Sequence, residues 1–156
     1  MPKPLSFQEA LHKAAAYCSS SEQCRHDISE KLQRWGIENG DAFKIIEYLS
    51  RQRFIDEARY SNGFVNDKFR FNKWGRIKIC YALRQKKIPE TLIDEAIGTI
   101  DDRQYEKTLR DILEAKRKGT KASDNYEMQA KLFRFAASRG FEPDIIQTVL
   151  RSMKLS

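Results

Sequence analysis

The sequence predicts an all-α protein of three tandem three-helix repeats, about nine helices in total, in an elongated, curved array. The first observation is composition: 156 residues include only seven Gly and four Pro, whereas the helix formers Ala, Leu, Glu, Lys and Arg are abundant. The second is spacing, because apolar residues recur three and four positions apart and so share one helical face. The third is an apolar pattern that occurs three times along the chain.

The threefold pattern is Ile28-x3-Leu32-x4-Ile37, which returns 51 residues later from Ile79 and after 53 more from Leu132. Each copy closes on a short helix-stop sequence. These sequences are Trp35-Gly36-Ile37, Lys86-Lys87-Ile88 and Arg139-Gly140-Phe141. Gly just past the last turn adopts the left-handed cap conformation at little cost. An apolar helix precedes each copy and another follows it, so the unit of repetition is three helices.

The first repeat, residues 1–53, is expected to hold helices at 6–18, 22–35 and 41–52. Ser6 and Glu9 have the spacing of a capping box, in which each side chain accepts a hydrogen bond from the other residue's backbone amide. Ser20 and Gln23 have the same spacing and are expected to start the second helix. Asp41 is expected to cap the third helix through its side-chain oxygen.

The second repeat, residues 54–100, is expected to hold helices at 57–71, 75–86 and 90–99, and the third, residues 101–156, at 102–118, 124–138 and 143–154. The expected caps are Asp56, Asp102 and Ser123, with Pro89 and Pro143 in first turns. A three-helix unit of about 50 residues buries too little surface to be stable alone, so each repeat should pack on its neighbours.

Positive charge is concentrated in the middle repeat. Residues 54–88 hold nine Lys/Arg and three Asp/Glu, so this stretch carries +6 of the total +7. Residues 1–53 sum to +1 and residues 89–156 to zero. A solvated helix surface accounts for any single Lys, but an excess confined to one repeat predicts a negatively charged partner.

Seven of the seventeen aromatic residues also lie between residues 54 and 88. Those at helical spacing are expected to be mostly core residues, together with Val65: Tyr60, Phe64, Phe69 and Phe71. Trp74 follows Lys73 in the turn between two helices, where a large ring is expected to be partly exposed. A packed connector and a stacking contact with a base or partner account equally well for this Trp.

A run of spaced residues in the middle repeat forms a longer pattern. It reads Phe54-Ile55-Asp56-Glu57-x-Arg59-Tyr60-x3-Phe64-Val65-x2-Lys68, then Lys73-Trp74-Gly75-x2-Lys78-Ile79-x3-Leu83-x2-Lys86-Lys87-Ile88. This pattern resembles the signature of the RecX family of recombination regulators. It departs from that signature at Lys87, where the family often has Gly, and at Glu57, where Asp is more frequent.

The resemblance implies a protein that lies in the groove of the filament that RecA recombinase forms on single-stranded DNA. Such proteins restrain ATP turnover, strand exchange and repressor self-cleavage. We accordingly expect a cytoplasmic monomer without a cofactor and with at most weak direct binding to DNA. The residues predicted to contact the filament or nucleic acid are Arg59, Lys68, Arg70, Lys73, Trp74, Arg76, Lys78, Arg84, Lys86 and Lys87.

Two other hypotheses rest on the same basic cluster. A plain nucleic-acid-binding helical module without a protein target would bind naked DNA tightly, and its affinity would fall steeply with salt. A helical-repeat scaffold whose basic face meets an acidic protein would keep binding filaments after the cluster is neutralised. The residues leave open which face meets DNA and which meets the recombinase.

The sequence offers little for catalysis or metal binding. It contains no phosphate-binding Gly loop, His-Glu-x-x-His pattern or nucleophile elbow, so we expect no enzyme. Cys18, Cys24, His12 and His26 match no familiar metal-site spacing, and Cys24 is expected on a buried helical stripe. The odd number of cysteines fits reduced thiols in a cytosol. No signal peptide is visible, and the longest apolar run, Ala14 to Cys18, is too short to span a membrane.

Overall fold

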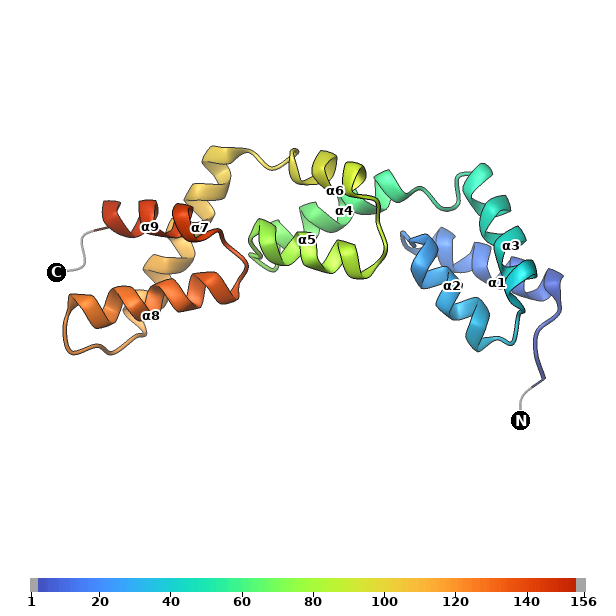
Figure 1. Ribbon diagram of the computed structural model, residues 1–156, viewed down its shortest axis with the longest axis horizontal. Helices are drawn as coiled ribbons and strands as arrows, with labels where there is room; N and C mark the ends of the chain where they lie inside the picture. The colour runs from blue at the N-terminus through green and yellow to red at the C-terminus, as the bar shows by residue number, and fades with distance from the viewer. Residues whose placement is uncertain (1–2, 154–156) are drawn as a thin grey trace.

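The computed structural model describes residues 3–153, which form nine α-helices and no strand. Their bounds are α1 Phe7–Ser20, α2 Arg25–Arg34, α3 Asn39–Arg51, α4 Glu57–Arg70, α5 Arg76–Gln85, α6 Glu90–Ile97, α7 Asp102–Lys118, α8 Asn125–Ser138 and α9 Pro143–Ser152. Three consecutive helices form each repeat, and the repeats follow one another in an elongated, gently curved row (Figure 1). The predicted all-α repeat architecture is confirmed.

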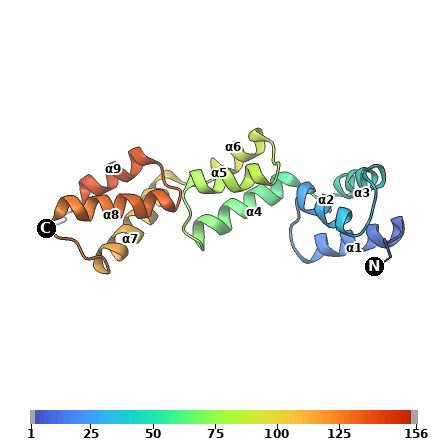
Figure 2. The same cartoon turned by 60° about the horizontal axis from the view of Figure 1, so that its bottom comes forward.

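The three repeats present their helices in the same order across the row. Figure 2 shows α1, α4 and α7 along one edge, α2, α5 and α8 in the middle, and α3, α6 and α9 along the other edge. The repeated apolar pattern accounts for this order, because its first positions, Ile28, Ile79 and Leu132, are all fully buried. The same sequence spacing therefore turns the same helical face inward in every repeat.

Each second helix ends in the same hydrogen-bonded turn. The amides of Ile37, Ile88 and Phe141 donate to carbonyls five residues earlier, at 3.0, 3.2 and 3.2 Å. The residues before them have positive φ: Gly36 81°, Lys87 60° and Gly140 94°. Lys87 thus takes the left-handed conformation that Gly takes in the other repeats, and the helix stops there as predicted.

Helix starts follow the predicted chemistry at some positions and not at others. The Ser6–Glu9 capping box, the Asp56 cap and Pro143 in a first turn are confirmed. Ser20 is wrong as a cap, since it lies in the last turn of α1 and donates to the carbonyl of Tyr17.

The predicted N-cap is wrong for three further helices, α3, α7 and α8. Asp41 lies in the first turn of α3 behind the N-cap Glu38, where its charge suits the positive end of the helix dipole. Asp101 caps α7 in place of Asp102, and Asp124 caps α8 in place of Ser123. In both cases the preceding or following residue offers an equivalent side-chain oxygen, so the spacing alone did not choose between neighbours. The predicted end of the last helix, residue 154, lies outside the described residues.

The buried residues form two separate cores. Repeat 1 has its own core, which includes Ile28, Leu32 and Ile45. Repeats 2 and 3 share one continuous core that includes residues from Val65 to Met153 and, from repeat 1, Cys24. The predicted boundaries after residues 53 and 100 stay predictions. Neither coincides with a division between cores, because Ile55 belongs to the core of repeat 1 and Cys24 to the core of repeats 2 and 3.

Two side chains differ from their predicted environments. Phe71 is 78% exposed, not buried, because it follows the last residue of α4 and so leaves the apolar stripe of that helix. Cys24 is fully buried as predicted, but it is the N-cap of α2 and not a residue on a helical stripe, and it packs into the core of repeats 2 and 3. No helix within residues 3–153 has the length and apolar character that a membrane span requires.

Candidate nucleic-acid and filament interface

Arg76, one of the predicted contact residues, joins repeat 2 to repeat 3. Its guanidinium donates to Asp102 at 2.7 Å and to Glu142 at 3.1 Å, and lies 3.9 Å from the centroid of the Tyr105 ring. Burial by itself would lower the pKa of Arg76, but the hydrogen bonds and charges of Glu142, Tyr105 and Asp102 together outweigh it, and the pKa is raised. With 20% of its side chain exposed, Arg76 is committed to the fold.

The N-terminus of α5 is also closed by repeat 3. The amide of Gly75 donates to the carbonyl of Arg139 at 2.7 Å, and that of Ile77 donates to the carbonyl of Gly140 at 2.9 Å. The Tyr105 hydroxyl accepts from the amide of Arg76 at 2.9 Å. Helix N-termini commonly bind anions through such amides, but these amides already have partners.

Repeat 1 joins repeat 2 through the buried Cys24, which packs into the core of repeats 2 and 3, and through charged groups. Lys86 pairs with Asp27 at 2.7 Å, and Arg59 donates to Glu22. The hydrogen bond to Asp27 raises the pKa of Lys86. Two predicted contact residues, Arg59 and Lys86, are therefore engaged across this junction.

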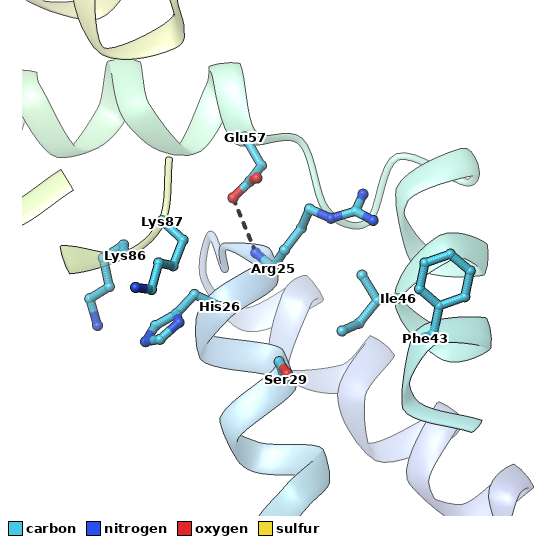
Figure 3. Close-up of a pocket in the computed structure, with 8 residues that line it drawn as sticks. All are labelled: Arg25, His26, Ser29, Phe43, Ile46, Glu57, Lys86 and Lys87. Carbon is cyan, nitrogen blue, oxygen red and sulfur yellow. Dashed lines mark hydrogen bonds between the residues drawn. The ribbon is translucent and has the colours of Figure 1, made fainter. Parts of the chain in front are cut away.

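A carboxylate completes the first junction. Glu57 accepts from the backbone amide of Arg25 at 3.2 Å, and burial raises its pKa. Beside this contact lies a groove of about 380 Å³, whose lining includes Arg25, His26, Phe43, Ile46, Lys86 and Lys87. Figure 3 shows the Lys87 side chain directed toward His26, opposite the apolar side chains of Phe43 and Ile46. The groove is thus basic on one side and apolar on the other.

One group of possible metal ligands occurs within the described residues: His26, Asp27 and Glu30. It contains neither Cys18 nor Cys24. His26 lies 3.0 Å from Glu30, and Asp27 already pairs with Lys86. These contacts explain why the three side chains lie close together: Asp27 belongs to the junction between repeats 1 and 2, and His26 and Glu30 interact on the surface of α2.

Trp74 lies between two lysines. The ammonium groups of Lys68 and Lys78 lie 4.8 and 4.5 Å from the centroid of its ring, and Phe64 meets it edge-on at 6.5 Å. The indole packs against the core of repeats 2 and 3. This geometry favours the packed connector, because the cations occupy positions that a stacking base would need.

The remaining predicted residues lie on the surface of repeat 2. Arg84 is exposed and pairs with Glu90 at 2.5 Å. Arg70, Lys73 and Lys87 are exposed. Within residues 3–153, five of the ten predicted residues are cations without a carboxylate partner: Lys68, Arg70, Lys73, Lys78 and Lys87.

The outer repeats contain cations over rings that the sequence analysis missed. Lys13 and Lys31 lie 4.7 and 4.5 Å from the rings of Trp35 and Tyr17. In repeat 3, Lys116 and Arg139 lie 5.0 and 5.3 Å from the ring of Phe135. Phe135 and Arg139 lie four residues apart, a spacing that could have revealed this pair, whereas the contacts of Lys13 and Lys31 join two different helical segments.

Comparison with known proteins identifies the family to which the chain belongs. Residues 56–97 match the second three-helix domain of RecX, and residues 104–150 match the third. A regulatory protein RecX of Chlorobium phaeobacteroides is 30% identical over 143 residues, 92% of each chain. The chain belongs to the RecX family. In the terms of this family, α4–α6 and α7–α9 form the second and third domains.

Other RecX proteins differ more in length. A regulatory protein RecX of Clostridium botulinum is 33% identical over 127 residues, which are 80% of this chain and 58% of that protein. One of Clostridium tetani is 29% identical over 92% of this chain and 66% of its own length. The match thus spans about three fifths to two thirds of these two relatives. A crystal structure of RecX from Lactobacillus salivarius has the same fold, with a TM-score of 0.84 over 96% of this chain and 97% of that one at 21% identity.

Proposed function

We propose that this RecX-family protein binds the filament that RecA forms on single-stranded DNA and inhibits its ATPase, strand-exchange and co-protease activities. Membership of the family supports a regulatory role. The single observation that supports contact with a charged filament is the uneven charge of repeat 2. Residues 57–87 hold nine basic and two acidic residues, a net charge of +7, whereas α6 holds three acidic residues and no basic one.

The elongated row suits a polymeric target. Contacts distributed over three repeats can reach neighbouring parts of a filament at once, so binding would hold those parts in a fixed relation. ATP turnover and strand exchange require a filament to change conformation, and a bound row opposes such changes through its differential affinity for one state. We place this regulator in the cytoplasm, acting as a monomer and without catalysis of its own.

The test is titration of the full chain into RecA filaments while ATP hydrolysis, strand exchange and repressor cleavage are followed. Inhibition of all three activities is expected, and no effect at stoichiometric amounts would contradict the proposal. A variant with Arg70→Glu, Lys73→Glu and Lys78→Glu should inhibit much less while keeping its helicity. Arg76 stays unchanged in this variant, because its replacement would disturb the junction between repeats 2 and 3.

A charge-matched control separates contact from net charge. Lys44 and Arg51 are exposed on α3 and have no carboxylate partner among residues 3–153. Lys44→Glu with Arg51→Glu, added to Lys3→Glu, changes the net charge by the same amount as the triple variant in repeat 2. This control should inhibit like the unaltered protein.

The second candidate function, a nucleic-acid-binding module without a recombinase target, is favoured by the cations over rings in all three repeats. It predicts equal affinity for naked single strands and for filaments. Tight filament binding beside weak binding to the naked strand would reject it.

A further inference from the structure

Among residues 3–153, seven cations lie over aromatic rings. Apart from Arg76, which is paired with Asp102 and Glu142, they number two in each repeat: Lys13, Lys31, Lys68, Lys78, Lys116 and Arg139. In each repeat at least one of these contacts joins the first helix to the second helix or to the turn beside it: Lys13–Trp35 and Lys31–Tyr17, Lys68–Trp74, and Lys116–Phe135. None of the six has a carboxylate partner within residues 3–153. Their charges are therefore available to an anionic partner.

The register of the repeats places repeats 1 and 2 on a common face. A shift of 51 residues carries Lys13 and Tyr17 onto Phe64 and Lys68, so ring and cation exchange positions on the first helix. The core supports this register, because Ala14 and its counterpart Val65 are both fully buried. Each of the two positions thus keeps a ring or a cation, although Lys13 contacts Trp35 and Tyr17 contacts Lys31, whereas Phe64 and Lys68 contact each other.

Repeats 1 and 3 are related in the same way through their second helices. Lys31 and Trp35 become Phe135 and Arg139 after the combined shift of 104 residues, which takes the fully buried Ile28 to the fully buried Leu132. In every repeat a cation–ring contact links the first helix to the second helix or to the turn beside it, and these helices keep one order across the row (Figure 2), so we treat the side between them as one face. We call this side, defined by the six cations, the cation–ring face.

The rings hold the cations in place. An ammonium over an indole or phenol ring loses rotamer freedom on folding and not on binding, so less entropy remains to be lost when a ligand arrives. Because the cations already cover ring surface, the chemistry offered to a ligand is positive charge and not base stacking. The acidic helix α6 lies on the other edge of the row, so the charge is directional.

We propose that the cation–ring face is the surface that follows the phosphate backbone of single-stranded DNA, across all three repeats. This assignment rests on the proposed function, in which the single-stranded DNA is the strand of the RecA filament. It adds to that function by stating which face of the three repeats meets the DNA. Recognition is independent of base sequence, because phosphates carry no sequence information.

The test measures affinity for naked single strands as a function of salt. The full chain is titrated into a fluorescein-labelled poly-thymidine oligonucleotide long enough to span the row, and log K is plotted against log salt concentration. Each phosphate neutralised on a single strand adds about 0.7 to the slope, so six cations would account for a slope of about 4. Lys68→Gln with Lys78→Gln should reduce the slope by about 1.4, and Lys13→Gln with Lys31→Gln by a similar amount.

The matched control is Lys44→Gln with Arg51→Gln on α3, which removes the same charge from the opposite edge and should leave the slope within about 0.3 of the original, a fraction of one phosphate contact. The proposal would be overturned if neither cation–ring variant lowered the salt slope below that of the control. It would also be overturned if the control lost as much slope as the two cation–ring variants. Circular dichroism and thermal unfolding identify any variant that fails to fold. If one of the two double variants, Lys68/Lys78 or Lys13/Lys31, does not fold, the salt slope of the other decides the test.

The outcome is separable from that of the proposed function. If the unaltered protein fails to inhibit RecA filaments, the proposed function is wrong, but the salt slopes still test whether the cation–ring face binds single-stranded DNA. If the protein inhibits filaments but the slopes do not distinguish the variants, only the assignment of the face is wrong.

Discussion

Gly75→Ala should separate repeats 2 and 3 without straining the backbone of the residue itself. Gly75 has φ −80° and ψ 170°, a conformation that Ala adopts readily. A Cβ atom added there, however, would lie 2.4 Å from the carbonyl carbon of Gly140 and 2.4 Å from the amide of Phe141. These are backbone atoms, so no side-chain rotation can relieve the contact.

The cost follows from what must move. Overpacking at a close contact costs about 1–3 kcal/mol. Moving α5 away also lengthens the hydrogen bonds from Gly75 and Ile77 to the turn of repeat 3, which are 2.7 and 2.9 Å long, at about 1 kcal/mol each. We therefore expect the free energy of unfolding to fall by about 3–5 kcal/mol.

The two tryptophans make the measurement specific. Trp35 belongs to repeat 1 and Trp74 to the core of repeats 2 and 3, so urea unfolding followed by fluorescence in a Trp35→Phe background reports on that core. Gly63→Ala is the matched control. Gly63 lies inside α4 and its added Cβ has no neighbour within 4 Å, so Ala should stabilise the protein by about 1 kcal/mol. A Gly75→Ala protein within about 1 kcal/mol of the original would refute the close packing of the two repeats.

Three other perturbations have defined outcomes. Arg76→Met should lower the free energy of unfolding by about 3 kcal/mol, because it leaves Glu142 partly buried without its cation. Arg84→Met breaks a fully exposed pair and should change this free energy little, so similar losses in urea unfolding for the two variants would contradict the assigned roles. Lys87→Gly should stabilise by about 0.5–1 kcal/mol, because Gly adopts the left-handed conformation without a Cβ clash, and a loss of stability would count against this turn. Hydrogen bonds from Ser123 and Lys131 lower the pKa of Glu127 to about 2 from its usual 4.5, so its contribution to stability is complete above pH 4.5 and is lost as pH falls toward 2. Glu127→Gln should flatten acid unfolding in that interval, and an unchanged pH profile would show that the carboxylate contributes nothing there.

The fold could be predicted because it depends on short-range patterns. The apolar positions that include Ile28, Ile79 and Leu132 fix which face of each second helix is buried, and they repeat visibly. Helix stops were equally accessible, even at Lys87, because the turn is set by the residues around it as well as by Gly. Caps were less so, since Asp101 and Asp102 offer the same oxygen one position apart.

The candidate site was harder to predict because pairing is a property of tertiary structure. Sequence spacing places Arg76 and Lys78 in one basic cluster, but Arg76 meets Glu142 from another repeat and Lys78 meets Trp74 from its own. The partners of Arg59 and Lys86, Glu22 and Asp27, likewise lie in repeat 1. No local pattern distinguishes a cation with such a partner from one without.

The division of the molecule into two cores makes its two joints mechanically unequal. The joint between repeats 2 and 3 is continuous with a core and shares main-chain hydrogen bonds, so it bends only if packing is broken. The joint between repeats 1 and 2 combines the buried side chain of Cys24 with exposed and partly exposed charges, and dissolved ions screen these charges. Rising salt therefore softens one joint and leaves the other stiff. On a partner whose helical pitch changes, α4–α9 would move as one rigid body, and the angle between repeat 1 and repeat 2 would change instead.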